Sequence, residues 1–267
     1  PKEISQIEGI DLVADNRMKA DIPRFLIKGG ASSKTTDLLK RYDADTPFDF
    51  LDIRSFPDRT RSYLKIQDGC QSLCSYCIVP VTRGPYRSLA PEKVLHMLEA
   101  LSGKGYREVV LTGIHLGKYG VDLRGDIDLM SLLQMVGREG YPLRIRLSSI
   151  EPNEIKMGFI EMAASERWLC RHFHIPLQSG DNRVLKKMNR NYITREFAEV
   201  IEAIYAKIPH VCIGVDIMTG FPGEDLNAHR NTCSFIKDLP LSYLHVFPFS
   251  PRPGTASDGF KGRVDPG

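Results

Sequence analysis

The sequence lacks the features that would assign it to a membrane or to secretion. It contains no apolar run of about 18 residues, the length that a helix needs to cross a bilayer. Its first residues, PKEISQIEGI, have neither the basic start nor the apolar stretch of a signal peptide. Low-complexity segments and repeats with a period of about 20–50 residues are also absent. We therefore expect a cytoplasmic protein with no membrane partner.

A strong charge of either sign is lacking too. The formal net charge is +3 among 267 residues, which permits contact with a polyanion such as RNA but does not establish it. The composition, 42% hydrophobic and 26% charged, is that of an ordinary globular protein. A chain of this length can bury a sizeable core in one or two domains.

Cysteine is scarce, and its distribution argues against a disulfide-rich secreted domain. Of the 6 cysteines, three are gathered within residues 70–77. Since the chain carries no export signal, metal ligation explains this gathering better than disulfide formation.

From residue 62 onwards, strand-like and helix-like patterns alternate. Strands are predicted at 63–67, 108–112, 144–148, 172–176, 211–218 and 243–248. Helices are predicted between them at 91–104, 128–138, 153–165, 181–189, 194–207 and 224–238. Parallel strands connected by helices form a sheet with the helices outside, so the predicted fold class is α/β, of barrel type.

The two ends of the chain do not follow this alternation. A helical start and a short strand at 10–13 are predicted first. Residues 29–61 are rich in Gly, Ser, Thr and Asp and are predicted to be a linker. Residues 251–267 are rich in Pro and Gly and are predicted to be a second linker. The barrel is thus expected to span 62–250.

Clusters of unusual residues follow each predicted strand. They lie at 69–77, 113–117, 148–152, 177–180, 220–224 and 249–254. In barrels of this type the chemistry occurs at the carboxyl ends of the strands. We therefore predict a single site on one face of the barrel.

The segment GCQSLCSYC carries three cysteines spaced CxxxCxxC, namely Cys70, Cys74 and Cys77. Thiolates ligate iron–sulfur clusters, and three on one loop hold three irons of a cube while the fourth iron stays open to an external ligand. The first alternative is a zinc site, which needs a fourth ligand such as Cys170 with His172 or His174 brought near by the fold. Three unrelated core cysteines are the second alternative.

This motif, with the aromatic Tyr76 before the third cysteine, resembles the signature of the radical S-adenosylmethionine (SAM) superfamily, whose fold is a partial (β/α)6 barrel. Several segments are similar to the methylthiotransferases of that superfamily: YLKIQDGC (63–70), CIVPVTRGPYRS (77–88), CRHFHIPLQSGDNRVLKKMNR (170–190), VDIMTGFPGE (215–224) and YLHVFPFSPRPGT (243–255). Two more, EVVLTGIHLGKYG (108–120) and RIRLSSIEP (144–152), are most similar to the branch that modifies N6-threonylcarbamoyladenosine in tRNA.

The resemblance implies one [4Fe–4S] cluster on the three cysteines and SAM as cosubstrate. Reductive cleavage of SAM would give a 5′-deoxyadenosyl radical that abstracts hydrogen. The implied target is C2 of N6-threonylcarbamoyladenosine at tRNA position 37, in the anticodon loop, and the implied electron donor is a flavodoxin or ferredoxin. Isopentenyladenosine tRNA or a ribosomal protein are alternative substrates. A non-catalytic iron–sulfur or zinc nucleic-acid-binding module is the alternative of another class.

The family architecture adds an N-terminal domain with an auxiliary [4Fe–4S] cluster and a C-terminal TRAM domain. By resemblance, residues 1–28 are a remnant of that N-terminal domain, and 251–267 lead towards the TRAM domain. Cys170, Cys212 and Cys233 fall in barrel segments and do not correspond to the auxiliary-cluster cysteines. We therefore expect this chain to cleave SAM, and expect the auxiliary cluster only in a full-length protein.

Three parts of the SAM site are implied by the resemblance. Tyr76 is expected to face the adenine. Thr112 and Gly113, at the end of a strand, are expected to hold the methionine amino group through exposed backbone. Ser149 is expected to reach the ribose. A plain polar turn at the end of a strand is the alternative for the last three.

Two further residues are predicted SAM contacts from their positions. His172, His174 and Gln178 share one strand face, and Gln178 is preferred because it lies past the strand's end. Asp216 is expected to point into the barrel, with nearby glycines allowing the backbone close to adenine.

Basic residues near these segments suggest a weak path for RNA phosphates. The predicted contacts are Arg83, Arg87, Lys186, Lys187 and Arg190. A solvated helix face is the alternative explanation of such a run.

Overall fold

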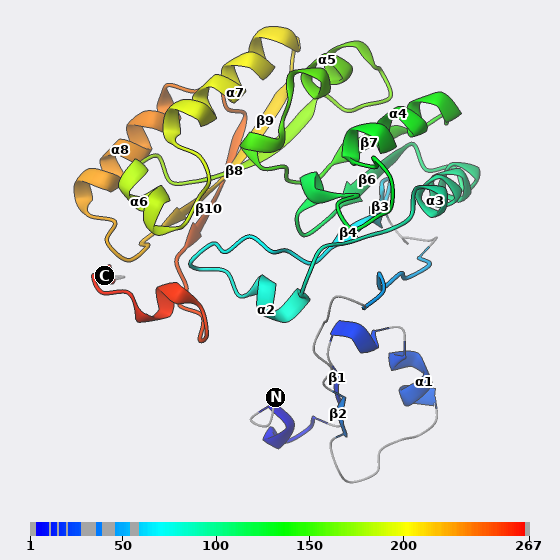
Figure 1. Cartoon of the computed structure of the whole chain (residues 1–267), viewed down its shortest axis with the longest axis horizontal. Coiled ribbons are helices and arrows are strands. Elements are labelled where there is room, and N and C mark those ends of the chain that lie inside the picture. Colours follow the sequence, from blue (N-terminus) through cyan, green and yellow to red (C-terminus); the bar gives the residue numbers. More distant parts are fainter. Residues whose placement is uncertain are drawn as a thin grey trace.

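The structure, a computed structural model, describes residues 4–10, 12–14, 16–19, 21–27, 36–38, 46–53 and 59–264. Six of its strands form the central sheet (Figure 1), and each coincides closely with a predicted strand. They are β3 (Ser62–Lys65), β6 (Glu108–Thr112), β7 (Arg144–Leu147), β8 (His172–Gln178), β9 (Cys212–Thr219) and β10 (Tyr243–Pro248).

All neighbouring strands of this sheet run parallel. One half has the order β3-β6-β7 and the other the order β8-β9-β10. The halves are joined where Ile145 bridges to Leu169 and where the Cys170 amide donates to the Ile145 carbonyl at 2.8 Å. The six strands therefore follow one another in chain order around an open curve, and the predicted partial (β/α)6 barrel is confirmed.

Helices cover the outer side of the strands, where Figure 1 shows α3, α4, α5, α7 and α8 as an arc. The helices of the barrel are α3 (Pro91–Gly103), α4 (Leu129–Glu139), α5 (Met157–Ser165), α6 (Asn182–Lys187), α7 (Thr194–Lys207) and α8 (Leu226–Lys237). Asp128, Asp181 and Asp225 cap α4, α6 and α8 by accepting hydrogen bonds from backbone amides in the first turn. A short 3-10 turn, Pro152–Glu154, precedes α5, so the helix predicted from 153 begins later.

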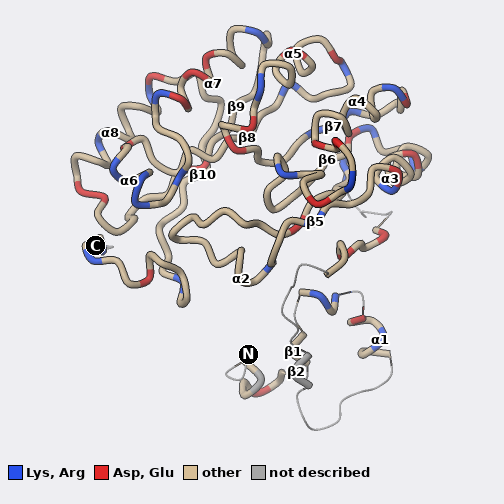
Figure 2. The backbone as a smooth tube through the Cα atoms, in the orientation of Figure 1, with Lys and Arg blue, Asp and Glu red and all other residues tan. Residues whose placement is uncertain are grey.

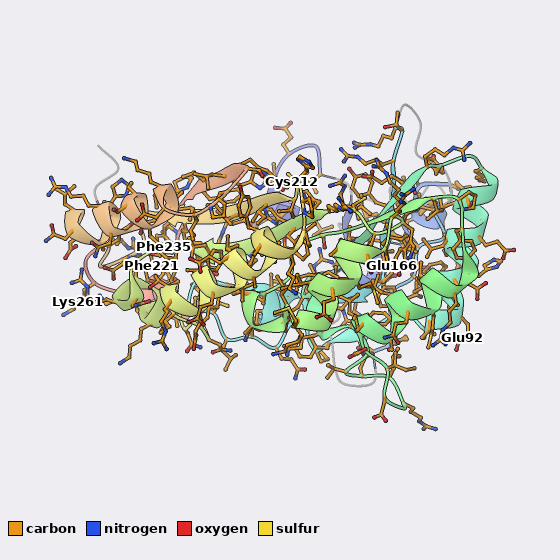
Figure 3. The ribbon with its side chains drawn as sticks, turned by 90° about the horizontal axis from the view of Figure 1, so that it is seen from above. Glu92, Glu166, Cys212, Phe221, Phe235 and Lys261 are labelled. Carbon is orange, nitrogen blue, oxygen red and sulfur yellow. The ribbon has the colours of Figure 1, made fainter. Side chains whose placement is uncertain are left out.

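Alternating strand residues and the inner helix faces make one continuous core. Val94, Leu98 and Leu101 of α3 are fully buried against it, as are Val109 and Leu111 of β6. Burying each such side chain contributes roughly 1.5–3 kcal/mol to folding. Figure 3 views the molecule from above, with Cys212 at the start of β9 and Phe221 just beyond its end. This core fixes the strand ends from which the site loops emerge.

Several short elements of the barrel were not predicted. Strands β4 (Gln67–Asp68) and β5 (Arg87–Ser88) pair antiparallel, and the loop between them carries α2 (Val79–Arg83) and the cysteine motif. A 3-10 turn, Leu116–Lys118, follows β6.

The N-terminal segment contains a two-stranded parallel sheet of its own. It consists of β1 (Leu12–Ala14) and β2 (Thr36–Leu38), with 3-10 turns at Ile4–Gln6 and Asn16–Met18 and helix α1 (Ile22–Ile27). The predicted strand at 10–13 overlaps β1, whereas β2 lies inside the predicted linker 29–61. Residues 1–3, 28–35, 39–45 and 54–58 lie outside the described part of the chain, so the boundaries 1–28 and 29–61 stay predictions.

The described residues after β10, up to 264, are packed against the barrel, and the linker expected at 251–267 stays a prediction. A 3-10 turn, Ala256–Gly259, contains the fully buried Ser257, whose amide donates to the Ser75 carbonyl at 2.8 Å. The Phe260 ring meets the Phe221 ring edge-on at 6.2 Å between centroids. Among the described residues, no helix combines the length and apolar character needed to cross a membrane.

Candidate cofactor site

The β4–β5 hairpin positions the cysteine motif. Gly69 has φ +74°, and a Cβ on it would lie 1.8 Å from the Pro85 carbonyl oxygen, so only glycine fits between the two arms. The Cys70 amide donates to the Gly84 carbonyl at 3.0 Å. The loop is therefore closed at its base, and the first cysteine is held at that closure.

Asp68 anchors the hairpin from inside. Its fully buried carboxylate accepts a hydrogen bond from Lys65 at 2.8 Å and lies 3.8 Å from Arg83 and 3.9 Å from Arg87. Burial opposes ionisation, but the bond from Lys65 and the nearby cations hold the pKa of Asp68 below its usual value. Arg87 is only 3% exposed, so its predicted RNA contact is corrected: it stabilises the loop. Arg83 is half-buried on the same carboxylate.

The three cysteines are free thiols close enough to influence one another. Burial raises the pKa of Cys77, and the negative charges of Cys74 and Cys70 raise it further. Three mutually repelling thiolates in one loop are costly unless positive charge neutralises them. That charge is supplied by two side chains from other elements, His115 and Arg190.

His115 lies beside the first cysteine. Its Nδ1 is 3.5 Å from Cys70 Sγ, and its Nε2 is 2.8 Å from Oε1 of Glu154. Although burial opposes protonation, the hydrogen bonds to Cys70 and Glu154 raise the pKa of His115 to about 9. Glycine at 117 is required because a Cβ there would lie 2.0 Å from the Glu154 carboxylate. His115 is thus held as a cation against Cys70.

Arg190 lies beside the second cysteine. Its Nη1 donates to Cys74 Sγ at 3.3 Å and to the Tyr76 hydroxyl at 3.4 Å, and its Nη2 donates to the Glu151 carboxylate. The guanidinium also lies over the Tyr192 ring, 5.0 Å from the centroid. Its side chain is 5% exposed, so the predicted RNA contact at Arg190 is corrected to a contact with the cysteine motif.

A cavity of about 340 Å³ opens in front of this arrangement. It is lined by Cys74, Tyr86, His115, Glu151, Arg190 and Tyr192, among other residues. Most of these side chains are polar, which suits a charged, hydrogen-bonding ligand of small-molecule size. We call the three cysteines, the two cations and this cavity the cysteine pocket.

Three predicted SAM contacts, Tyr76, Thr112 and Gly113, lie on the segments that carry the cysteine motif or His115, but none of them lines the cavity itself. Tyr76 packs edge-on against Phe221 at 6.4 Å between centroids, and burial raises its pKa well above the usual value, so the hydroxyl stays neutral. Gly113 follows β6, and a Cβ on it would lie 2.9 Å from Gln67 Cβ. The Thr112 carbonyl accepts a hydrogen bond from Ile66, which uses part of the backbone predicted to bind methionine.

The other predicted SAM contacts belong to β7, β8 and β9. Ser149 Oγ is 2.6 Å from His174 Nδ1, and Asp216 Oδ1 is 3.1 Å from His174 Nε2. Gln178 ends β8 with φ +67°, after a bulge in its pairing with β9. Among the described residues, Ser149 and Asp216 therefore pair with histidines and not with the cysteines of the motif.

Lys186 and Lys187 differ from the three arginines among the predicted RNA contacts. Both are exposed on α6, where Figure 2 shows basic residues. They are accessible to a polyanion, whereas Arg87 and Arg190 are not.

Sequence analysis missed His115, Glu151 and Glu154 as site residues. His115 lies within the cluster 113–117 that follows a predicted strand, and Glu151 within 148–152, so their positions gave a signal. Their roles depend on pairing across 39 residues each, His115 with Glu154 and Arg190 with Glu151, and no local pattern reveals such pairing.

Comparison with known proteins gives consistent results. The family profile described as "Radical SAM superfamily" matches residues 64–236. Threonylcarbamoyladenosine tRNA methylthiotransferase MtaB of Bacillus subtilis is 37% identical over 99% of this chain and 59% of its own length. The tRNA-2-methylthio-N(6)-dimethylallyladenosine synthase of Pelotomaculum thermopropionicum is 37% identical over 73% of this chain and 44% of its own length. The chain thus spans about half the length of these curated relatives.

A solved structure with a similar fold is the radical SAM methyltransferase TsrM of Kitasatospora setae, determined with cobalamin and a [4Fe–4S] cluster. It superposes with a TM-score of 0.62 over 73% of this chain and 38% of that chain, at 16% identity. At this identity the likeness concerns the fold alone.

Proposed function

Because this chain belongs to the radical SAM superfamily, we propose that it is the SAM-cleaving core of a tRNA methylthiotransferase that modifies C2 of N6-threonylcarbamoyladenosine at position 37. The observation that carries this proposal is the cysteine pocket. Cys70 and Cys74 each receive a hydrogen bond from a buried cation, His115 or Arg190, and each cation is held by its own glutamate.

The residues of the pocket fit a cluster held by three thiolates. Cys70, Cys74 and Cys77 are free, come from one loop, and repel one another unless a positively charged centre lies between them. No fourth cysteine is provided by the described loop, which suits a cluster with one open iron. When bound, the cluster supplies the electron that cleaves SAM and so generates the radical that abstracts hydrogen from the substrate.

The chain's own residues would bind, orient and shield the reactants. His115 and Arg190 lower the energy of the thiolates and keep the motif in one conformation. Tyr76, which packs edge-on against Phe221 and is kept neutral by burial, is proposed to cover the adenine. Thr112, Gly113, Ser149, Gln178 and Asp216 stay proposed SAM contacts.

One observation favours the threonylcarbamoyl substrate over isopentenyladenosine. Identity is 37% to both kinds of relative, but the match covers 99% of this chain for the threonylcarbamoyladenosine enzyme and 73% for the dimethylallyladenosine enzyme. The two kinds of relative therefore differ in how much of this chain they match, and not in percentage identity.

Several partners follow from this proposal. An anticodon loop would present its base as a single strand, with Lys186 and Lys187 contacting phosphates at the pocket's edge. A flavodoxin or ferredoxin would supply electrons, and the reaction would occur in the cytoplasm, where tRNA is modified. In a full-length protein an auxiliary cluster would supply the sulfur.

Methylthio transfer by this chain alone is not expected. Apart from the motif, its cysteines are dispersed: Cys170 is buried beside β7, Cys212 begins β9, and Cys233 is exposed on α8. They offer no second set of ligands, so no methylthiolated nucleoside should form under multiple turnover.

Transfer of deuterium from tRNA to 5′-deoxyadenosine tests which nucleoside is the substrate, and this test does not require sulfur insertion. Cluster-loaded protein, SAM and reductant are mixed with tRNA deuterated at C2 of N6-threonylcarbamoyladenosine or, in a parallel arm, of isopentenyladenosine. Deuterium in 5′-deoxyadenosine from the first arm alone is the expected result. Transfer only from the second arm would assign the other tRNA branch, and transfer from neither would remove the RNA substrate from the proposal.

A further inference from the structure

A second group of titratable side chains lies on the strands of the barrel's other half. His174, Asp216 and His245 come from β8, β9 and β10, which are consecutive in the sheet. Asp216 is directly opposite His245 in the strand register. His174, Asp216 and His245 are far apart in the sequence, so only the fold brings them together. We call them the histidine cluster.

The ligand atoms of this cluster converge on one point. Asp216 Oδ1 is 3.1 Å from His174 Nε2 and 3.3 Å from His245 Nδ1, and all three ligand atoms lie within 4.8 Å of one another. Nitrogen and oxygen ligands about 2.1 Å from a metal ion are separated by about 3.0–3.4 Å when the angle at the metal is about 90–110°. The two separations to Asp216 fall in this range.

His174 Nε2 is buried and has no hydrogen-bond partner in the part of the chain that the structure describes, although it lies next to a carboxylate. Its other nitrogen, Nδ1, is 2.6 Å from Ser149 Oγ. If Nδ1 donates to Ser149, Nε2 turns a lone pair towards Asp216, and two acceptors then face each other. A cation between them removes that repulsion. A hydrogen bond from the second ring nitrogen to an outer partner is the usual arrangement of a metal-bound histidine.

The surrounding residues hold these rings in place. The Tyr243 ring stacks on His174 at 6.1 Å between centroids and lies 5.2 Å from the His245 ring. Gly214 makes room for it, since a Cβ there would lie 2.0 Å from the tyrosine ring. The Tyr243 hydroxyl is 2.9 Å from His172 Nε2, which fixes the tyrosine ring beside the cluster.

We propose that the histidine cluster binds one divalent first-row transition-metal cation such as Zn²⁺, Fe²⁺ or Mn²⁺. Two imidazoles and one carboxylate form a ligand set typical of these ions and leave coordination positions for water or a substrate oxygen. The His245 side chain is 52% exposed, which gives the ion a route from solvent. The site uses none of the cysteine ligands, but it shares Asp216 and Ser149 with the proposed SAM contacts, so metal is counted in the absence of SAM.

Metal counting on the cluster-loaded chain tests this site, because the motif cysteines are then occupied by iron. After dialysis against Zn²⁺ and then against metal-free buffer, mass-spectrometric metal analysis should give one zinc per chain in addition to the cluster iron. His245→Ala and the isosteric Asp216→Asn should each lose this zinc. His96→Ala, an exposed histidine on α3, should retain it. Absence of zinc from the parent chain, or its retention in both His245→Ala and Asp216→Asn, would overturn the proposal.

Co²⁺ absorption in the cluster-free Cys70→Ala/Cys74→Ala/Cys77→Ala chain identifies the ligands. Weak visible bands without sulfur-to-cobalt charge transfer are expected, because all three ligand atoms are nitrogen or oxygen. Ser149→Ala should weaken Co²⁺ binding about 10–100-fold, as loss of an outer-shell partner does. Sulfur-to-cobalt charge transfer that disappears with Cys212→Ser would place the ion on a barrel cysteine and contradict the proposal.

Discussion

The cysteine pocket and the histidine cluster place charge in opposite ways. In the pocket, cysteine sulfurs face two buried cations, and each cation is paired with its own glutamate. In the histidine cluster, one carboxylate is shared by two imidazoles, and His174 Nε2 has no hydrogen-bond partner among the described residues. The first region has positive charge fixed in advance around its thiolates. The second has ligand atoms that still lack a positive charge between them.

Because of this difference, the cysteine pocket suits an iron–sulfur cluster and the histidine cluster suits a single divalent metal ion. Thiolates bridged to iron carry net negative charge, which His115 and Arg190 offset. A lone divalent ion is instead attracted by a carboxylate with neutral imidazoles and would be repelled by a fixed guanidinium. Two sites in one barrel can therefore select different groups through their own neighbouring side chains.

The largest expected effect is loss of the iron–sulfur cluster, which concerns the cysteine pocket and not the histidine cluster. Cys74→Ala should abolish the cluster, because two thiolates cannot hold a cube with an open fourth iron, while parent protein should contain close to four irons and four sulfides per chain. Anaerobic reconstitution followed by iron and sulfide analysis measures both. Cys233→Ala, on the exposed face of α8, is the matched control and should load normally. Stoichiometric zinc without sulfide in the parent would mean that the motif is a zinc site.

The next effect concerns the fixed cation of the pocket. Arg190→Met leaves the partly buried Glu151 without its partner and should lower the free energy of unfolding by about 1–3 kcal/mol. Arg195→Met removes an exposed arginine paired with Glu199 at 3.6 Å and should change it by about 0–1 kcal/mol. Urea denaturation of the cluster-free chains gives both values. Equal effects would show that Arg190 is not part of a buried charge network.

The pH dependence of stability should have opposite signs for His115, in the cysteine pocket, and for His172, which lies beside the histidine cluster. The pKa of His115 is raised to about 9, so its contribution is complete below its ordinary value of 6.5 and is lost as the pH rises through 9. The pKa of His172 is lowered to about 4, so its contribution is present above 6.5 and is lost as the pH falls through 4.

Urea denaturation of cluster-free chains across this pH range checks both signs. The parent should have a higher free energy of unfolding than His115→Gln at low pH, and this difference should disappear at high pH. Its difference from His172→Gln should disappear at low pH. If the difference in free energy of unfolding between the parent and a histidine variant did not vary with pH, the charge state assigned to that histidine would be wrong.

The smallest expected effect lies outside both regions, on α6. Lys186→Ala and Lys187→Ala should each weaken tRNA binding modestly and reduce the slope of log affinity against log salt by about 0.7–0.9. Lys93→Ala on the exposed face of α3 is the control. An unchanged slope in the α6 variants, measured by filter binding, would remove these lysines from the RNA path.

Sequence reasoning worked where the relevant residues are close in the chain. Strand and helix periodicity located all six barrel strands, and the cysteines stand within one loop. It did not find the β4–β5 hairpin, since strands of two residues carry no periodicity. Arg87 and Arg190 were assigned to RNA because a basic residue is usually exposed, and only the fold shows that both are buried on carboxylates.

The histidine cluster was outside the reach of sequence patterns for a related reason. His174 and Asp216 were each considered for SAM binding, but the approach of His245 depends on the register of β9 with β10. Parallel strands are joined by long crossovers, so residues that meet across them are distant in sequence.

Formation of 5′-deoxyadenosine most directly tests the central claim that the cysteine pocket performs reductive SAM cleavage. Cluster-loaded chain is incubated anaerobically with SAM and dithionite, and the nucleoside is quantified by liquid chromatography and mass spectrometry. We predict 5′-deoxyadenosine and methionine in equal amounts from the parent and from Cys233→Ala, and none from Cys74→Ala. A chain that carries a full complement of iron and sulfide, yet yields no 5′-deoxyadenosine under strong reductant, would contradict the claim.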